Sequence, residues 1–174
     1  PEYTHILKLY KNPKPVFEAM NITKQIKASF GKNVTIKNGV YLVIEHTEAM
    51  HVIDVNSGNR TKAGKDQEEN ARTVNMEAAV EIARQLRLRD MGGIISIDFI
   101  DMRKPANRSA LYQKMVQLMK EDKAKHTILP VNKFGIVQIT RQRVRQEKVI
   151  HVAETCPSCR GTGKVQPAIL IVKE

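Results

Sequence analysis

The pattern of hydrophobic and polar positions along the chain predicts alternating helices and strands. Apolar residues recur with helical spacing over residues 73–90, where glutamates come early and arginines late, an order that suits the helix dipole. Asn38-Gly39 lies between two β-rich runs and predicts a hairpin. We expect helices at 22–30, 73–90 and 108–125, strands at 34–36, 40–44, 50–55, 94–100, 127–131 and 134–140, and a loop at 59–70. This order predicts a two-layer or three-layer α/β domain.

Composition and charge narrow the class of protein. Hydrophobic residues make up 41% of the 174 residues and charged residues 27%, which is ordinary for a globular domain. The net charge is +11, and residues 103–148 alone hold twelve basic and three acidic residues. This basic stretch favours a polyanionic partner, nucleic acid first and an anionic membrane second. The alternative is a merely solvated surface. Aromatic residues are only 5%, so we expect phosphate contacts rather than extensive base stacking.

Segments that direct a protein to membranes or to the exterior are not found in the sequence. No apolar run is long enough for a transmembrane helix, and no secretory leader opens the chain. Two cysteines are too few for a disulfide-stapled scaffold. We therefore expect a cytoplasmic protein without a transmembrane segment. The first residue is Pro1 rather than Met, which suggests a piece of a longer protein.

Two predicted strands carry acidic residues that point to a metal. Side chains alternate along a strand, so Asp54 and Asn56 share one face. The nearly continuous apolar run at 94–100 is typical of a buried strand, yet it contains Asp98. A buried acid is costly unless it is paired or binds a cation, and Mg²⁺ commonly binds through one or two carboxylates. Asp54 and Asp98 are therefore candidate Mg²⁺ ligands. The alternative is that they cap turns or pair with arginines.

A series of motifs, in the same order along the chain, matches one known family. The motifs are 53–57 (IDVNS), 75–79 (NMEAA), 81–90 (EIARQLRLRD), 92–93 (GG), 97–102 (IDFIDM), 134–135 (FG), 141–143 (RQR) and 156–163 (CPSCRGTG). With them the chain resembles the catalytic core of the ribonuclease E/G family over almost its whole length. The resemblance implies a mixed sheet flanked by helices, of the DNase I-like type, followed by a short zinc-link segment. It assigns residues 1–47 to the end of an RNase H-like subdomain and a connecting segment, 48–152 to the DNase I-like catalytic subdomain, and 153–174 to the zinc link.

The same resemblance implies an activity and a set of site residues. It implies an Mg²⁺-dependent endoribonuclease that hydrolyses phosphodiester bonds in single-stranded RNA, in RNA processing and decay. The family's catalytic residues fall on Asp54, Asn56 and Asp98, with the two aspartates as Mg²⁺ ligands. Lys125 falls where the family tends to have a basic residue near the cleavage site. The alternative is a non-catalytic RNA-binding or assembly module that keeps the fold and the zinc link.

Three arginines near the end of the last predicted strand are candidates for RNA binding. If that strand continues to Arg145, then Arg141, Arg143 and Arg145 share one face and can contact phosphates.

Cys156 and Cys159 have the Cys-x-x-Cys spacing of zinc ligands, and the glycines that follow allow a tight turn around a metal. A redox role is the weaker alternative, since no thioredoxin-like strand and helix follow. A zinc-ribbon co-chaperone is a more distant one, because that type repeats the motif and this chain has one copy. Structural zinc needs four ligands, so two chains that each give two thiolates would complete the site. The family resemblance implies the same shared zinc, in a homodimer or a dimer of dimers.

Overall fold

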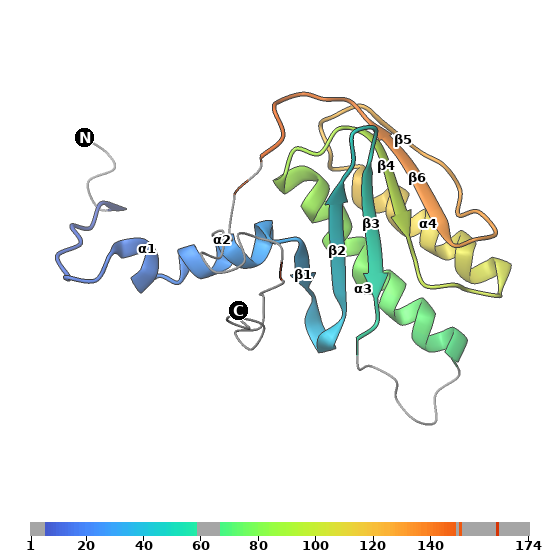
Figure 1. Ribbon diagram of the computed structural model, residues 1–174, viewed down its shortest axis with the longest axis horizontal. Helices are drawn as coiled ribbons and strands as arrows, with labels where there is room; N and C mark the ends of the chain where they lie inside the picture. The colour runs from blue at the N-terminus through green and yellow to red at the C-terminus, as the bar shows by residue number, and fades with distance from the viewer. Residues whose placement is uncertain (1–5, 59–66, 149, 151–162, 164–174) are drawn as a thin grey trace, which may run out of the picture.

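The computed structural model describes residues 6–58, 67–148, 150 and 163. Figure 1 shows the arrangement of the helices and strands. The elements are α1 (Val16–Ala19), α2 (Ile22–Phe30), β1 (Asn33–Thr35), the short 3₁₀ turn η2 (Lys37–Gly39), β2 (Tyr41–His46), β3 (His51–Asn56), α3 (Gln67–Leu88), β4 (Gly93–Asp98), α4 (Pro105–Met119), β5 (His126–Ile128) and β6 (Ile136–Arg141). The predicted order of elements is confirmed.

The six strands form one sheet in the order β1-β2-β3-β4-β6-β5. Strands β3 and β4 run parallel, with α3 as the crossover between them, and every other neighbouring pair is antiparallel. The predicted mixed α/β sheet is therefore confirmed. The hairpin predicted at Asn38-Gly39 joins β1 to β2, and both residues have positive φ (63° and 81°), the conformation that an Asn-Gly turn favours.

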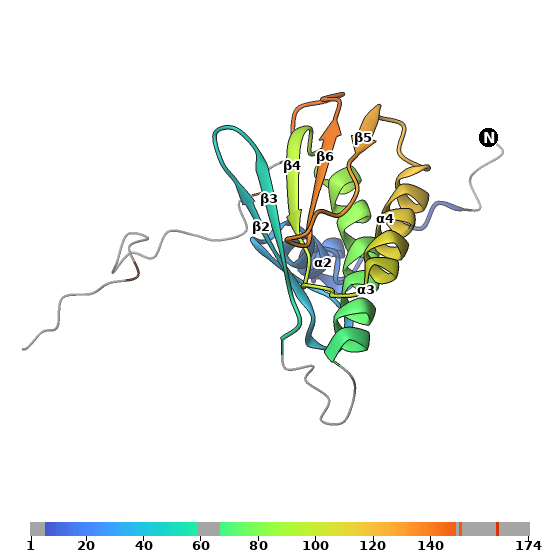
Figure 2. The same ribbon diagram turned by 90° about the vertical axis from the view of Figure 1, so that its right-hand side faces the viewer.

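Helices α3 and α4 cover one face of the sheet, as Figure 2 shows. The core lies between these two helices and the sheet. It consists of alternate strand residues packed against one side of each helix. The largest fully buried members are Leu42, Ile53, Ile95, Ile97 and Ile139 from the strands and Ile82, Leu86, Leu111, Met115 and Met119 from the helices. The alternating pattern leaves the other strand residues on the opposite face, which no described helix covers.

Several element boundaries, and the burial of one strand, differ from those expected. Helix α3 begins at Gln67, so the last part of the loop predicted at 59–70 is helical, with acidic residues in the first turn. Helix α4 begins with Pro105 in its first turn and ends at Met119, six residues earlier than predicted. Strand β4 is buried on one face only: Ile95 and Ile97 are fully buried, whereas 49% of Ile94 is exposed. An apolar run therefore did not mean a strand buried on both faces.

One of the two predicted subdomain boundaries lies within the described residues. The boundary expected between residues 47 and 48 falls in the turn that joins β2 to β3, and these strands pair along their whole lengths in one sheet. The zinc-link segment with Cys156 and Cys159 lies outside the described residues. The division into subdomains therefore stays a prediction. None of the described helices is both long and apolar enough to cross a membrane.

Candidate active site at the ends of β3 and β4

The two acids singled out in the sequence are neighbours in the structure. Strands β3 and β4 pair in parallel with Asp54 opposite Asp98. Ile53 and Ile97, one residue earlier in each strand, are fully buried against the helices, so both aspartates project from the opposite, open face. Neighbouring strands lie about 4.8 Å apart, so two carboxylates share one small area of this face. Both stand at the carboxyl ends of parallel strands, where open α/β sheets commonly bind ligands.

The electrostatics of this pair favour a cation. The pKa of Asp98 is raised above its ordinary value by burial, and further by the neighbouring negative charges of Asp54 and Asp101. Like charges this close make the fully ionised state unfavourable in the absence of a counterion. A divalent cation between the carboxylates would remove this cost, and carboxylate oxygens are ligands that Mg²⁺ prefers. The donor set therefore fits Mg²⁺.

Asn56 belongs to the same group of side chains. Its Nδ2 donates a hydrogen bond of 2.6 Å to Oδ2 of Asp54, since residues two apart in β3 lie on one face. This contact fixes the orientation of the Asp54 carboxylate without adding a charge to it. The structure thus brings together Asp54, Asn56 and Asp98, as the sequence suggested.

A cavity of about 720 Å³ lies beside the end of β4, between the starts of α3 and α4 and the turn before β6. Its lining combines several basic side chains with one aromatic ring. The lining residues on which the argument depends are Arg103, Lys104, Arg108, Lys133 and Phe134. The Phe134 ring is 76% exposed, which is unusual for so large an apolar side chain. The Glu68 carboxylate accepts hydrogen bonds from the backbone N–H groups of Arg103 and Lys104, and so holds the cavity wall to α3.

The turn that carries Phe134 is packed against the residues that follow Asp98. The backbone N–H of Phe99 donates to the carbonyl of Gly135, and a Cβ at Gly135 would lie 2.9 Å from the Phe99 carbonyl oxygen. Gly135 has φ of +80°, so this position requires glycine for space and for conformation. Asn132 Oδ1 accepts hydrogen bonds from the N–H groups of Phe134 and Ile136 and so stabilises the turn. The motif that contains Phe134 gives no sign in the sequence that this side chain is exposed.

The prediction that Arg141 contacts RNA is wrong. Its side chain is buried at the end of β6, where Nε and Nη2 donate to the two carboxylate oxygens of Asp122 at 2.7 and 3.0 Å. Nη1 donates to the Met91 carbonyl at 2.8 Å. Burial tends to raise the pKa of Asp122, but the hydrogen bonds from Arg141 and from the Ala124 N–H outweigh it, and the pKa is lowered. Each of the three guanidinium nitrogens of Arg141 thus donates to an oxygen of the protein, and the role of Arg141 is structural.

The remaining basic candidates are exposed but lie away from the acid pair. Strand β6 ends at Arg141, so Arg143 and Arg145 do not continue its face as the sequence suggested. Arg143 packs over Gly92 and Gly93, close enough that a Cβ on Gly92 would lie 2.6 Å from Cγ of Arg143. Lys125 precedes β5, whose first residue, His126, is level with Gly93 of β4 across β6, and Asp98 is the last residue of β4. At about 3.3 Å per residue, Lys125 is roughly 20 Å along the strand direction from Asp98.

The fold and the paired acids define an α/β domain with a candidate metal site, and comparisons with known proteins identify its family. The ribonuclease E/G family model matches residues 1–144. Ribonuclease E of Escherichia coli is 40% identical over 166 residues, which are 95% of this chain and 16% of that protein. Ribonuclease E of Haemophilus influenzae is 39% identical over 95% of the chain and 18% of its own length. Ribonuclease G of Escherichia coli is 36% identical over 95% of the chain and 34% of its own length.

The chain therefore belongs to the ribonuclease E/G family, as its motifs indicated. It spans about a sixth of the ribonuclease E relatives and a third of the ribonuclease G relatives.

Proposed function

We propose that this chain forms the catalytic part of an endoribonuclease that hydrolyses single-stranded RNA with Mg²⁺, in cytoplasmic RNA processing and decay. The observation that carries the proposal is the placement of Asp54 and Asp98 opposite each other on parallel strands, with the pKa of Asp98 raised by burial and by its acidic neighbours. Membership of the ribonuclease E/G family supports the substrate class.

Each site residue has a role in this proposal. Asp54 and Asp98 hold the Mg²⁺ ion, which when bound supplies a Lewis acid for the phosphate and lowers the pKa of a water. Asn56 positions the Asp54 carboxylate through its 2.6 Å hydrogen bond, and its uncharged amide can also hold a water or a phosphate oxygen. Because both carboxylates lie on the open face of the sheet, an extended RNA strand can reach them from solvent.

The cavity beside β4 is suited to hold the RNA next to the acids. The exposed Phe134 ring offers a surface on which a base can stack, which contributes roughly 1–3 kcal/mol per base. Lys133 and Arg103 line the same cavity and can contact phosphates on either side of that base. Lys125, Arg143 and Arg145 are exposed at the other end of the sheet, where they can contact a strand several nucleotides from the acids.

The zinc-link part of the proposal depends on ligand counting. We propose that Cys156 and Cys159 of two chains share one Zn²⁺, so that the protein forms a homodimer or a dimer of dimers. The chain offers two cysteines at zinc-ligand spacing, and a structural zinc site needs four ligands. A two-fold axis through the metal supplies the other two.

The test of the active site is a gel cleavage assay on the full-length protein with a single-stranded RNA. We expect cleavage that requires Mg²⁺ or Mn²⁺, and a loss of about 100- to 1,000-fold in Asp54→Asn and in Asp98→Asn, since a metal ion contributes several kcal/mol to the transition state. Glu45→Gln is the matched control, because Glu45 also lies on the open face of the sheet but pairs with Lys32.

Two results would contradict this assignment. Full activity in both aspartate variants would show that the pair is not catalytic. A wild-type protein that binds RNA but does not cleave it at any Mg²⁺ concentration would favour the alternative, a non-catalytic RNA-binding module.

A further inference from the structure

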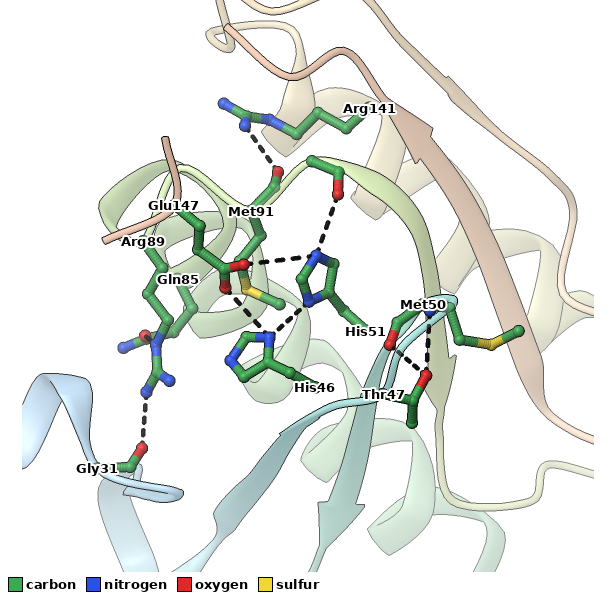
Figure 3. Close-up of polar contacts among 11 residues, drawn as sticks. Gly31, His46, Thr47, Met50, His51, Gln85, Arg89, Met91, Arg141 and Glu147 are labelled. Atoms are coloured by element: carbon green, nitrogen blue, oxygen red, sulfur yellow. Dashed lines mark hydrogen bonds and ion pairs between the residues drawn. The ribbon is translucent and has the colours of Figure 1, made fainter. Parts of the chain in front are cut away.

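Two histidines meet at the end of the sheet opposite to the acid pair. His46 is the last residue of β2 and His51 the first of β3, and they are paired in the antiparallel register. The turn between them is held by Thr47, whose Oγ1 donates to the Met50 carbonyl at 2.7 Å and accepts from the Met50 N–H at 3.0 Å. Glu147, from the segment after β6, reaches both rings (Figure 3). Three separate parts of the chain thus place one potential metal ligand each at the same point.

The distances among these ligand atoms are short. Nδ1 of His46 lies 2.6 Å from Nδ1 of His51 and 3.1 Å from Oε1 of Glu147. One ligand atom from each of the three residues lies within 4.8 Å of the others. Oε1 of Glu147 is buried and has no hydrogen-bond partner among the described residues, although the His46 ring is close. A buried carboxylate oxygen without a partner requires an explanation, such as an ion.

The hydrogen bond of His51 to a backbone carbonyl indicates which of its ring nitrogens carries the proton. Its Nε2 lies 3.0 Å from the Gly92 carbonyl oxygen, which can only accept, so Nε2 carries the proton. In neutral His51 the Nδ1 atom is then a bare acceptor that faces His46. His46 Nδ1 has at most one proton, yet it faces two acceptors, His51 Nδ1 and Glu147 Oε1. One cation placed among the three atoms would satisfy all of them.

We propose that His46, His51 and Glu147 form a binding site for a divalent transition-metal ion of the Zn²⁺ type. Imidazole nitrogens and a carboxylate oxygen are the ligands of three-residue zinc sites, which leave the fourth position open. The hydrogen bond from His51 Nε2 to the Gly92 carbonyl is the outer contact that metal-bound histidines usually make. The site is separate from the acid pair, at the other end of β3, and its three ligands include neither cysteine.

The surroundings of the site fit this ligand set and also limit its affinity. Burial lowers the pKa of His46, with the charges of His51 and Arg89 acting in the same direction and Glu147 opposing them. Arg89 is a positive neighbour, but its guanidinium is held by Gln85 and by the carbonyls of Ser29 and Gly31. Because Arg89 places a positive charge near the site, we expect it to weaken the binding of a cation.

The three proposed ligands lie at a cavity of about 590 Å³. Arg143 and Arg145 line this cavity together with His46, His51 and Glu147, and Asp90 lies there in an ion pair with Lys148. A metal bound here would tie the segment after β6 to the β2–β3 turn. It should therefore stabilise the fold, with a rise in Tm of roughly 5–10 °C at a hundredfold excess over the dissociation constant.

The experiment uses the full-length protein with Cys156→Ser and Cys159→Ser, so that thiolates do not compete for the metal. Zn²⁺ is titrated by calorimetry, and Co²⁺ binding is followed by visible absorption. We expect one tight site per chain, with the spectrum of four-coordinate cobalt and no thiolate charge-transfer band. His51→Gln and, separately, Glu147→Gln should weaken binding at least tenfold. His126→Gln is the matched control, because the Nδ1 of His126 bonds the Ala124 carbonyl and His126 is not part of the cluster.

A second measurement does not depend on whether the variants fold, because it uses the protein with all three ligands intact. Histidine ¹⁵N resonances of the protein with intact His46 and His51 should show Zn²⁺ at Nδ1 of both rings, whereas His126 should not respond. Absence of Zn²⁺ and Co²⁺ binding in the cysteine-free protein would overturn the proposal, as would binding that His51→Gln and Glu147→Gln leave unchanged. Neither result would bear on RNA cleavage at Asp54 and Asp98.

Discussion

Arg141 and Arg143 are two residues apart in a basic segment, yet the structure predicts opposite consequences when each is replaced by methionine. Arg141 donates three hydrogen bonds, two to Asp122 and one to the Met91 carbonyl, and only 5% of its side chain is exposed. Asp122, with 3% of its side chain exposed, would keep a charge without a counterion. Arg143 is exposed and forms no ion pair among the described residues. Arg141→Met should therefore destabilise the fold, and Arg143→Met should not.

The size of this difference follows from the burial of the pair. Removing one partner of a buried ion pair costs about 3–5 kcal/mol, whereas an exposed substitution usually changes stability by less than about 0.5 kcal/mol. For a domain of this length each kcal/mol corresponds to about 2–4 °C, so Arg141→Met should lower Tm by roughly 6–20 °C. In the variant, burial still acts to raise the pKa of Asp122, while the hydrogen bonds and the charge of Arg141 that lower this pKa are lost. The pKa of Asp122 should therefore rise from its wild-type value, so the loss of stability should be largest at neutral pH and shrink as Asp122 becomes protonated.

Urea unfolding from pH 4 to 8 and RNA binding at several salt concentrations measure both effects. We expect Arg143→Met to unfold like the wild type but to flatten the salt dependence of RNA binding by about 0.7 per lost phosphate contact. Adding Asp122→Leu to Arg141→Met should recover part of the lost stability, because it removes the unpaired charge. The reasoning would be refuted by an Arg141→Met protein of normal stability whose RNA binding has lost salt dependence.

Three further predictions concern the acids, the aromatic ring and the cysteines. Because the pKa of Asp98 is raised in the folded protein, ionised Asp98 lowers the stability of the fold at pH values above the ordinary pKa of an aspartate. Asp54→Asn should lower the pKa of Asp98, measured by ¹³C NMR titration without metal. An unchanged pKa of Asp98 would contradict the coupling between the two aspartates. Phe134→Ala should weaken single-stranded RNA binding by about 1–3 kcal/mol without changing its salt slope, while Phe134→Tyr should keep the affinity; equal losses in both would argue against stacking. Cys156→Ser with Cys159→Ser should convert dimer to monomer in sedimentation with most secondary structure retained, and a zinc-linked dimer in that variant would rule out the shared site.

Local patterns predicted much of this fold. The helical period over 73–90, the Asn38-Gly39 turn and the apolar strand runs each gave an element of the right type. The acid pair was also predictable, because an acid on an apolar strand is costly unless it is paired or binds a cation, and residues two apart on a strand share a face. The register that places Asp54 opposite Asp98 was not predictable, since nothing in the local sequence specifies which residues of two parallel strands lie opposite each other.

The errors come from burial that only the tertiary structure reveals. Arg141 looked like one of a row of basic side chains, but Asp122, nineteen residues earlier, buries and neutralises it. Ile94 looked buried because its strand is apolar, but no described helix covers that face. No sequence motif predicts the cluster of His46, His51 and Glu147 as a whole, because its third member lies 96 residues after the second. The spacing of two histidines around a short turn was the one local signal.

The proposed activity depends on a divalent ion that Asp54 and Asp98 bind together, and one measurement tests this shared binding directly. The full-length protein is labelled with ¹³C at its aspartate carboxyl groups and loaded with Mn²⁺ in place of Mg²⁺, and electron–nuclear double resonance detects the carbons bound to the metal. We predict couplings to two aspartate carboxyl carbons, reduced to one in Asp54→Asn and in Asp98→Asn, and unchanged in Glu45→Gln. Couplings that persist in both aspartate variants, or are absent in the wild type, would contradict the account.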